Sequence, residues 1–280
     1  TSFWNTPLPA DAPLHASSAG YVAELGRQLG FAVPWINTTQ YSTPVYTVPA
    51  DAPTVRVALD VNVPELQQAL EAVPIPAGAA AARGTDQHLT VWQPATDTMW
   101  ELWLARRGLD GRWRARWGGR MTGVSTNPGH FTQKDWGATA TGLPLLGGLI
   151  RTKELEVGRI DHALAFAIPD ALAGQFVWPA QRTDGNRWDA GSIPEGTRFR
   201  IDPNLDLATV SMPASVRAIA VAAQRYGIVL RDRAGAVTFY AEDSTPNGPN
   251  PYFGLGALFG TDDLSQQLRT FPWSHLQALR

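Results

Sequence analysis

The middle of the chain, residues 86–120, reads DQHLTVWQPATDTMWELWLARRGLDGRWRARWGGR. Apolar and polar residues alternate along three stretches of it, which predicts β-strands over residues 88–93, 99–106 and 112–117. Residues 94–97 and the pair Asp110-Gly111 are typical of turns between such strands. We therefore expect an antiparallel meander whose register decides which side chains share a face.

The register of this meander separates apolar from polar side chains. With two-residue turns at Ala95-Thr96 and Asp110-Gly111, one face carries residues that we expect to be buried together: Trp100, Leu102, Leu104, Trp113 and Trp117. The opposite face carries Asp86, His88, Trp92, Glu101 and Trp103, with arginines of the third strand that include Arg114, Arg116 and Arg120. The clean separation favours this register, because a slip by one residue would mix the two sets.

The polar face is either an ordinary solvent-exposed sheet surface or a ligand-binding surface. Cross-strand pairs of Glu and Arg, most simply Glu101 with Arg120, are ordinary on a solvated sheet. Tryptophans beside these charges favour a ligand, because an exposed indole is costly and sugar rings stack well on it. The face is therefore a candidate saccharide groove. Its candidate catalytic residues are Glu101, Asp86 and His88, and its candidate substrate-binding residues are Trp92, Trp103, Arg114 and Arg116.

Further candidates lie outside the meander. His162 alternates with Leu164 and Phe166 at the start of an expected strand, and Glu154 stands shortly before it. A hydrogen-bonded core histidine is the common role for such a residue, and a base beside a carboxylate is the functional one. Glu154 and His162 are therefore added to the catalytic candidates, and Asn127 and Trp178 to the substrate-binding candidates.

Composition excludes several classes of protein. The 280 residues contain no cysteine, so disulfides, thiolate metal sites and thiol catalysis are excluded. A net charge of −2 gives no electrostatic reason to expect nucleic acid as a partner. No apolar run is long enough to predict a membrane span. The five histidines lack metal-ligand spacing, and we expect neither a metal nor a cofactor.

The chain as a whole is typical of a loop-rich β-protein, with 11 Trp, 22 Pro and 26 Gly. Helical periodicity appears over residues 17–29 and 213–226, more weakly over 64–72, and again from Asp262. No linker divides the sequence. We expect a single monomeric domain over residues 1–280, an antiparallel β-sandwich of jelly-roll type with a few peripheral helices. The opening Thr1-Ser2-Phe3, without an initiator Met, is typical of a mature secreted chain or of a chain that has been trimmed, and we expect secretion.

Motifs along most of the chain form a recognisable set. They begin with Trp4-Asn5 and a Ser-rich helix start and continue with Asp86-x-His88, Glu101, Ser125, Asn127, Trp136, Gly142-Leu143-Pro144, Arg151, Glu154, Gly158-x-Ile160-x-His162-Ala163, Trp178-Pro179-Ala180 and Tyr226-Gly227. The set resembles a family of uncharacterised secreted proteins abundant in actinobacteria. The resemblance implies export, a compact domain and a shared site for Asp86, His88, Glu101, Glu154 and His162.

The chain departs from that family pattern at two places. The family usually has an acidic residue between the positions of Trp136 and Gly142, where this chain has Gly137-Ala138-Thr139-Ala140-Thr141. A histidine commonly follows the Trp-Pro-Ala motif, where this chain has Gln181-Arg182. These departures imply a different substrate or an inactive member if either residue belongs to the usual chemistry.

Three functions fit the candidate residues. The first is a glycoside hydrolase that uses Glu101 with Asp86 or Glu154 as its pair of carboxylates. The second is a polysaccharide lyase in which His88 or His162 removes a proton and Arg114, Arg116 or Asn127 neutralises a uronate carboxylate. The third is a carbohydrate-binding module without catalysis, for which 280 residues is large. The spare carboxylates favour hydrolysis of a polysaccharide.

Overall fold

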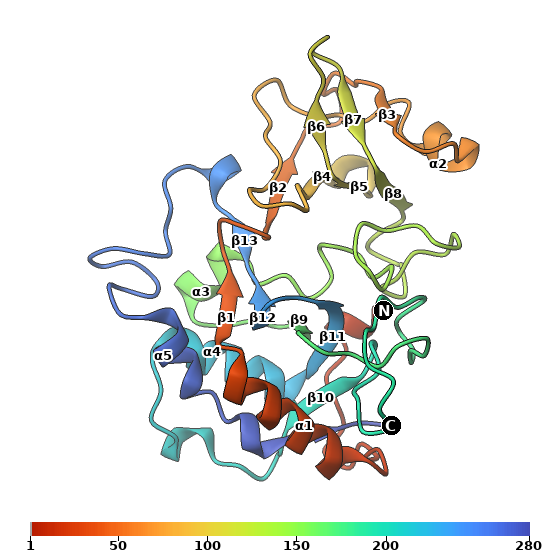
Figure 1. The fold of residues 1–280 in the computed structure, drawn as a ribbon. Coiled ribbons are helices and arrows are strands. Elements are labelled where there is room, and N and C mark those ends of the chain that lie inside the picture. The colour runs from red at the N-terminus through yellow and green to blue at the C-terminus, as the bar shows by residue number, and fades with distance from the viewer. Residues whose placement is uncertain (1) are drawn as a thin grey trace.

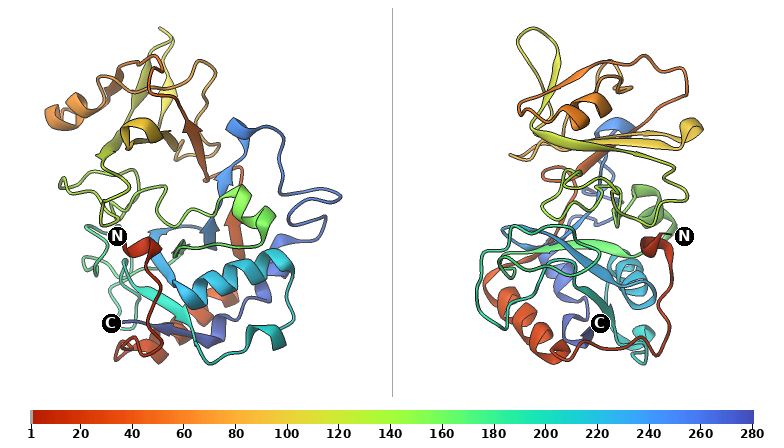
Figure 2. Two further views of the ribbon diagram at one scale, coloured as in Figure 1. Left: turned by 180° about the vertical axis from the view of Figure 1, so that it is seen from behind. Right: turned by 90° about the vertical axis from the view of Figure 1, so that its right-hand side faces the viewer.

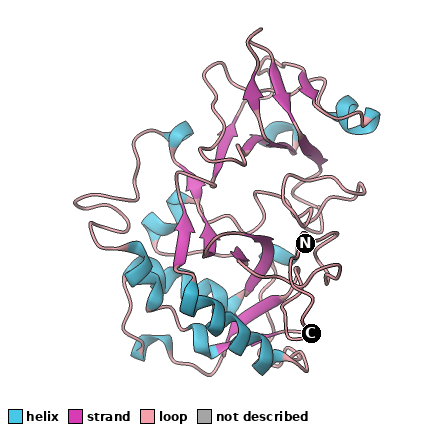
Figure 3. Ribbon diagram, viewed as in Figure 1, coloured by secondary structure: helices cyan, strands magenta, loops and turns pink. Residues whose placement is uncertain are grey.

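The computed structural model describes residues 2–280 (Figure 1). Strands account for 25% of the residues, and the five α-helices lie at the periphery (Figure 3). The prediction of a β-rich fold with peripheral helices is confirmed. The sheets are mixed, where purely antiparallel sheets were expected, and a jelly-roll sandwich is not confirmed. That expectation fails because several paired strands are parallel, joined by long crossovers instead of hairpins.

A six-stranded sheet forms the lower part of the molecule in Figure 1. Its strands, in spatial order, are β1 (Pro34–Asn37), β12 (Val237–Tyr240), β9 (Leu164–Ile168), β11 (Ile228–Arg233), β10 (Arg198–Ile201) and β14 (Leu276–Ala278). One face packs on three helices that continue the same apolar core, α1 (Ser18–Phe31), α4 (Ala214–Arg225) and α5 (Leu264–Arg269). The helical periodicities over residues 17–29 and 213–226 are therefore confirmed to within two residues.

Alternation along the central strand β9 gives this sheet two different faces. Leu164, Phe166 and Ile168 belong to the core beneath the helices. Ala165 and Ala167 point the other way, into a smaller cluster that includes Trp4 and Leu143. Small alanines on that second face leave room for chain segments to pack close to the sheet.

The upper part of the molecule holds two further sheets. The five-stranded sheet has the order β13 (Glu242–Asp243), β2 (Thr43–Thr47), β4 (Leu89–Gln93), β5 (Thr98–Trp103) and β8 (Trp117–Thr122). The three-stranded sheet has the order β3 (Val57–Leu59), β7 (Trp113–Ala115) and β6 (Arg106–Arg107), and α2 (Pro64–Ala69) lies beside β3. A second apolar core packs between these elements.

Two parallel pairs of strands connect the lower and upper parts. β1 runs beside β12 in the lower sheet, and β2 and β13, which follow them in the chain, pair with each other in the upper sheet. Between the two sheets lies a layer of loops drawn in green, residues 126–149, which leads to α3 (Thr152–Val157) (Figure 2). Short 3-10 helices complete the structure: η1 (Phe3–Asn5), η2 (Pro94–Thr96), η3 (Leu207–Thr209), η4 (Thr245–Asn247) and η5 (Trp273–His275).

The first half of the predicted meander register is confirmed. Thr90 pairs with Glu101 and Val91 with Trp100, as a two-residue turn requires. Leu89, Val91, Trp100 and Leu102 all lie in the upper core together with Trp113. His88, Glu101 and Trp103 accordingly lie on the opposite face of β4 and β5.

The second half of the register is wrong by one residue. The hairpin loop has three residues, 109–111, closed by the bond from Gly108 N to Arg112 O (2.8 Å), because Gly111 adopts a positive φ of 74°. Trp117 therefore pairs with Trp103, on the face where Glu101 lies. It is only partly buried, at the margin of the core that contains Trp113. Leu104, with a φ of 52°, ends the strand and is only partly buried.

The slip also separates the predicted ion pair. Gly119 stands opposite Glu101, and Arg120 stands opposite Trp100 on the other face, where its side chain is exposed. Arg114 lies in β7 and pairs with Asp110 (3.1 Å), and Arg116 is exposed. The expected bridge between Glu101 and Arg120 is therefore not formed.

Within residues 2–280, no helix combines the length and apolar character that crossing a membrane requires. That the chain folds as one domain over residues 1–280 stays a prediction.

Glycine at position 119 is required by close packing. A Cβ built there would lie 2.6 Å from the ring of Phe131, a side chain that is 1% exposed. We expect Gly119→Ala to lower the free energy of unfolding by about 1–3 kcal/mol, as overpacking does. Gly20→Ala in α1, where nothing lies within 4 Å, should raise it by about 0.5–1 kcal/mol. Denaturant unfolding of both variants checks this, and a Gly119→Ala protein as stable as the wild type contradicts it.

Candidate functional site

A pocket of ≈ 630 Å³ opens between the upper sheet, the loop layer and the lower sheet. Its lining includes Asp86, His88, Trp103 and Trp117 from the upper part, Arg182 and Asp184 from loops, and Asp232 and Arg233 from β11. A second pocket of ≈ 380 Å³ adjoins it and shares Asp86, His88, Asp232 and Arg233. These four residues therefore mark the junction of two cavities.

Glu101 lies in β5 of the upper sheet and contacts the loop layer. Its side chain is 0% exposed, and its two oxygens accept hydrogen bonds from Ala138 N (2.6 Å) and Leu145 N (2.7 Å). Burial raises the pKa of Glu101 to about 7, although the two N–H donors and the charges of Arg231 and Arg182 act in the opposite direction. Because both oxygens are occupied and Glu101 does not line the pocket, its geometry favours a positioning role over the predicted catalytic one.

Arg231 holds the same loop layer from below. It lies at a β-bulge, where the pairing of β11 with β9 shifts between Leu230 and Asp232. Its Nη1 donates to the carbonyls of Leu145 (3.0 Å) and Gly147 (3.1 Å), and its guanidinium lies 4.2 Å from the centre of the Tyr240 ring. The bulge thus turns a buried cation toward the loop and leaves the next residue, Asp232, at the pocket wall.

Arg182 fixes the rim of the pocket. Its guanidinium donates to the carbonyls of Gly137 (2.8 Å), Thr139 (2.8 Å) and Ala140 (3.0 Å). The backbone of residues 137–140, which lines the pocket, is therefore held by Arg182 on one side and by Glu101 on the other.

Asp86 and His88 reach the junction of the two pockets from the start of β4. Burial raises the pKa of the Asp86 carboxyl, against a hydrogen bond from Trp103 that lowers it. His88 is 5% exposed, and its burial, with the charge of Arg231, lowers its pKa to about 3 despite a hydrogen bond to the Ala138 backbone. The imidazole is therefore neutral at physiological pH, when it can donate or accept a hydrogen bond but is a poor base.

On the opposite wall, Asp184 and Asp232 belong to a cluster of three carboxylates whose third member is the buried Glu195. One oxygen from each of Asp184, Glu195 and Asp232 lies within 4.8 Å of the other two. Burial and the neighbouring acids raise the pKa of Glu195 to about 8 and that of Asp232 to about 7. The three residues come from separate parts of the chain, and only the fold brings them together.

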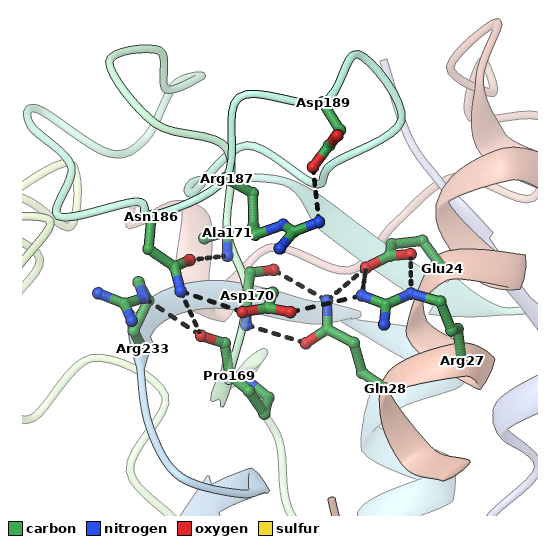
Figure 4. Close-up of polar contacts among 10 residues, drawn as sticks. All are labelled: Glu24, Arg27, Gln28, Pro169, Asp170, Ala171, Asn186, Arg187, Asp189 and Arg233. Carbon is green, nitrogen blue, oxygen red and sulfur yellow. Dashed lines mark hydrogen bonds and ion pairs between the residues drawn. The ribbon is translucent and has the colours of Figure 1, made fainter. Parts of the chain in front are cut away.

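An anchored loop carries Asp184. Gln28 of α1 donates to Asp170 O (2.8 Å) and accepts from Asp170 N (3.1 Å), and Asn186 accepts from Ala171 N (3.1 Å) (Figure 4). Arg233 donates to Pro169 O (3.2 Å) and to Asp184 O (3.0 Å). These bonds hold the ends of the loop against α1 and β11, which fixes the position of Asp184 beside the pocket.

An aromatic wall completes the pocket. Trp103 and Trp117 are directly paired across β5 and β8, and both are partly exposed. The Trp117 indole N–H donates to Asp135 O (2.8 Å). Two neighbouring indoles beside several carboxylates form a surface on which a sugar ring can stack.

The remaining predicted residues are not part of this pocket. His162 and Glu154 contact each other at 3.1 Å, and His162 and Asn127 line a separate cavity of ≈ 160 Å³ that shares no lining residue with it. Burial lowers the pKa of His162, but Glu154 outweighs this and the net shift is upward. Both His162 nitrogens are engaged, with Glu154 and Ala163 O, as in a structural histidine.

The other expected substrate-binding residues are also dispersed. Trp92 is packed between the upper core and the small central cluster. Trp178 is 65% exposed and lies against Phe3, beside another cavity. Of the predicted site, the pocket contains Asp86, His88 and Trp103, with Glu101 directly behind it.

Several site residues were missed from the sequence. Asp184, Glu195, Arg231 and Asp232 lie outside the motifs and candidate residues described above. One signal was present: Arg231-Asp232-Arg233 ends a buried strand, and charges at such a place need partners. Nothing local indicates that those partners are residues 144–147 and 184.

Glu101→Gln tests the positioning role. A Gln side chain can accept one of the two backbone N–H groups but turns its own NH2 toward the other, so we expect a loss of about 1–3 kcal/mol in unfolding free energy. The exposed control Glu156→Gln, which loses only its contact with Lys153, should change stability by less than about 0.5 kcal/mol. Melting curves measure both. An unchanged melting temperature with a large loss of activity would restore the catalytic interpretation of Glu101.

Comparison with known proteins adds no assignment. No family model matches the chain, and neither a curated protein nor a solved structure is significantly similar to it. What can be said of function therefore rests on the geometry of these pockets.

Proposed function

We propose that this protein is a carbohydrate-active enzyme that hydrolyses a polysaccharide at the junction of the two pockets. One observation carries the proposal: among the described residues, Asp86 and Asp232 are the carboxylates that line both cavities. A glycan occupying both pockets would place one of its linkages beside these two groups. Paired carboxylates on either side of a glycosidic bond are the usual machinery of its hydrolysis.

The two carboxylates take different roles in this proposal. One of them is the proton donor to the leaving oxygen, a role that suits a carboxyl whose pKa is raised by burial, as it is for both Asp86 and Asp232. The other, on the opposite wall, activates water or stabilises positive charge on the sugar. Neutral His88 positions a hydroxyl group of the sugar by hydrogen bonding.

The aromatic wall supports a sugar as the ligand. Trp103 and Trp117 offer a stacking surface beside the proposed point of cleavage. Polar groups around an apolar platform are the pattern expected for a pocket that orients a hydroxyl-rich ligand.

Hydrolysis is favoured over elimination by the state of the basic residues. A lyase needs free cationic donors for the uronate carboxylate, whereas Arg182 gives its guanidinium N–H groups to backbone carbonyls and Arg233 donates to the carbonyls of Pro169 and Asp184. It also needs a base, and the pKa of His88 near 3 makes that imidazole a weak one. Secretion, a monomeric state and membership of the actinobacterial family that the motifs resemble belong to the same proposal.

Digestion of a panel of neutral and acidic polysaccharides tests the reaction. We expect new reducing ends without the ultraviolet absorbance of an unsaturated product. An unsaturated product would establish elimination instead, and binding without any cleavage would establish a carbohydrate-binding module. Either outcome contradicts the proposal.

The roles are tested by substitution at Asp86. On the substrate that the panel identifies, we expect Asp86→Asn to lower kcat by about 10²–10⁴-fold, with melting temperature nearly unchanged, because the side chain lines a pocket and is not packed in a core. Asp51→Asn, an exposed position outside both pockets, is the matched control and should keep wild-type activity. An Asp86→Asn enzyme that retains most of its kcat rules out Asp86 as one of the two catalytic carboxylates.

A further inference from the structure

Two carboxylates of the lower pocket wall, Asp184 and Asp232, have the geometry of a cation site together with the buried Glu195. Asp184, Glu195 and Asp232 each offer an oxygen, and the three oxygens lie within 4.8 Å of one another. Two ligands on opposite sides of a calcium ion, at bond lengths of about 2.4 Å, are about 4.8 Å apart. The observed spacing therefore allows one ion to contact all three residues.

A second observation concerns the Glu195 side chain alone. It is 0% exposed, and its Oε1 has no hydrogen-bond partner. Its other oxygen, Oε2, accepts from Asp184 N (3.1 Å), and the Thr183 side chain also interacts with the carboxylate. A buried carboxylate oxygen without a donor is costly, so it requires an explanation. A bound cation supplies the missing partner.

Existing positive charge does not neutralise the cluster. Arg233 lies 3.6 Å from Asp184 Oδ2, but its other contacts are the carbonyls of Pro169 and Asp184. Among the described residues, the donors to Asp232 are the backbone groups Arg233 N (2.8 Å) and Ala140 N (3.4 Å). Arg231 and Arg182 act on Asp232 only through their charges, and among the described residues no guanidinium other than that of Arg233 forms an ion pair with the three acids.

We propose that Asp184, Glu195 and Asp232 bind one hard divalent cation, with Ca²⁺ preferred over Mg²⁺. All three ligands are carboxylates, which suits a hard ion. Ca²⁺ tolerates irregular geometry, whereas Mg²⁺ requires a near-ideal octahedron with shorter bonds. The sequence predicted no metal site because Asp232 stands far from Asp184 and Glu195 in the chain and the three form no recognisable ligand spacing.

The location gives the ion a role in substrate binding. Asp184 and Asp232 also line the larger pocket, so the positions of the ion not filled by protein face that cavity. Sugar hydroxyls are oxygen ligands of the kind that Ca²⁺ accepts. This consequence rests on the proposed function, whereas the binding of the ion does not.

Calorimetric titration of metal-free full-length protein with CaCl2, and separately with MgCl2, tests the site without any substrate. We expect one Ca²⁺ per chain, a higher melting temperature in Ca²⁺ than in EDTA, and at least about tenfold weaker binding of Mg²⁺. Asp184→Asn and Glu195→Gln should each weaken Ca²⁺ binding by about tenfold or more. Asp189→Asn, on the same loop but paired with Arg187, should bind Ca²⁺ like the wild type.

Several results would overturn the proposal. They are the absence of Ca²⁺ binding by wild-type protein at millimolar concentrations, wild-type affinity in the Asp184→Asn variant, and equal loss in the Asp189→Asn control. Asp184 is exposed, so its substitution leaves the fold intact. If Glu195→Gln does not fold, the Asp184→Asn variant decides the question. Because no glycan is present, these results are independent of whether the enzyme hydrolyses polysaccharide.

Discussion

Two buried charges hold the loop layer in place between the sheets. Glu101 accepts the N–H groups of Ala138 and Leu145 from above, and Arg231 donates to the carbonyls of Leu145 and Gly147 from below. Each charge is costly to bury, and each interacts with backbone groups of opposite polarity, although the Nε of Arg231 has no hydrogen-bond partner among the described residues. The loop backbone therefore supplies hydrogen-bond partners to the side chains of Glu101 and Arg231, and these two side chains hold the loop in one conformation.

The pocket follows from this arrangement. The loop covers the middle of the polar face of the upper sheet and leaves its end near Asp86, His88 and Trp103 open. The β-bulge that directs Arg231 inward also brings Asp232 to the opposite wall. Proposed substrate contacts thus come from both sheets. The hydrogen bonds of Glu101 and Arg231 to the loop determine the distance between the two pocket walls. A site assembled in this way is rigid where it is buried and adaptable only at its open side.

Much of the upper sheet could be predicted from sequence, because its causes are local. The alternation in residues 88–103 and the short turn at Ala95-Thr96 determine which side chains face the core, and both are visible in the chain. The second turn was wrong because a three-residue loop with Gly111 at positive φ and a two-residue loop leave similar sequence signatures. That single residue moved Trp117 from the expected core to the pocket wall and separated Arg120 from Glu101.

The site itself could be predicted only in part. Asp86, His88 and Glu101 stand close together in sequence, so pairing of adjacent strands was enough to associate them. The residues on the other side of the pocket are brought there by long chain connections that sequence periodicity does not encode. They lie at positions 182–184, 195 and 231–233. Glu154 and His162 were grouped with the site by family resemblance, and they pair with each other at a different cavity.

Amide hydrogen exchange at Ala138 and Leu145 tests the central claim most directly. If Glu101 holds the loop layer as described, both amides should exchange only through global unfolding, as slowly as the most protected amides of β5 and β9. Fast exchange at Ala138 and Leu145, while β5 and β9 remain protected, would show that the loop opens independently of the sheets. The buried charges of Glu101 and Arg231 would then not fix the walls of the pocket, which would contradict the central claim.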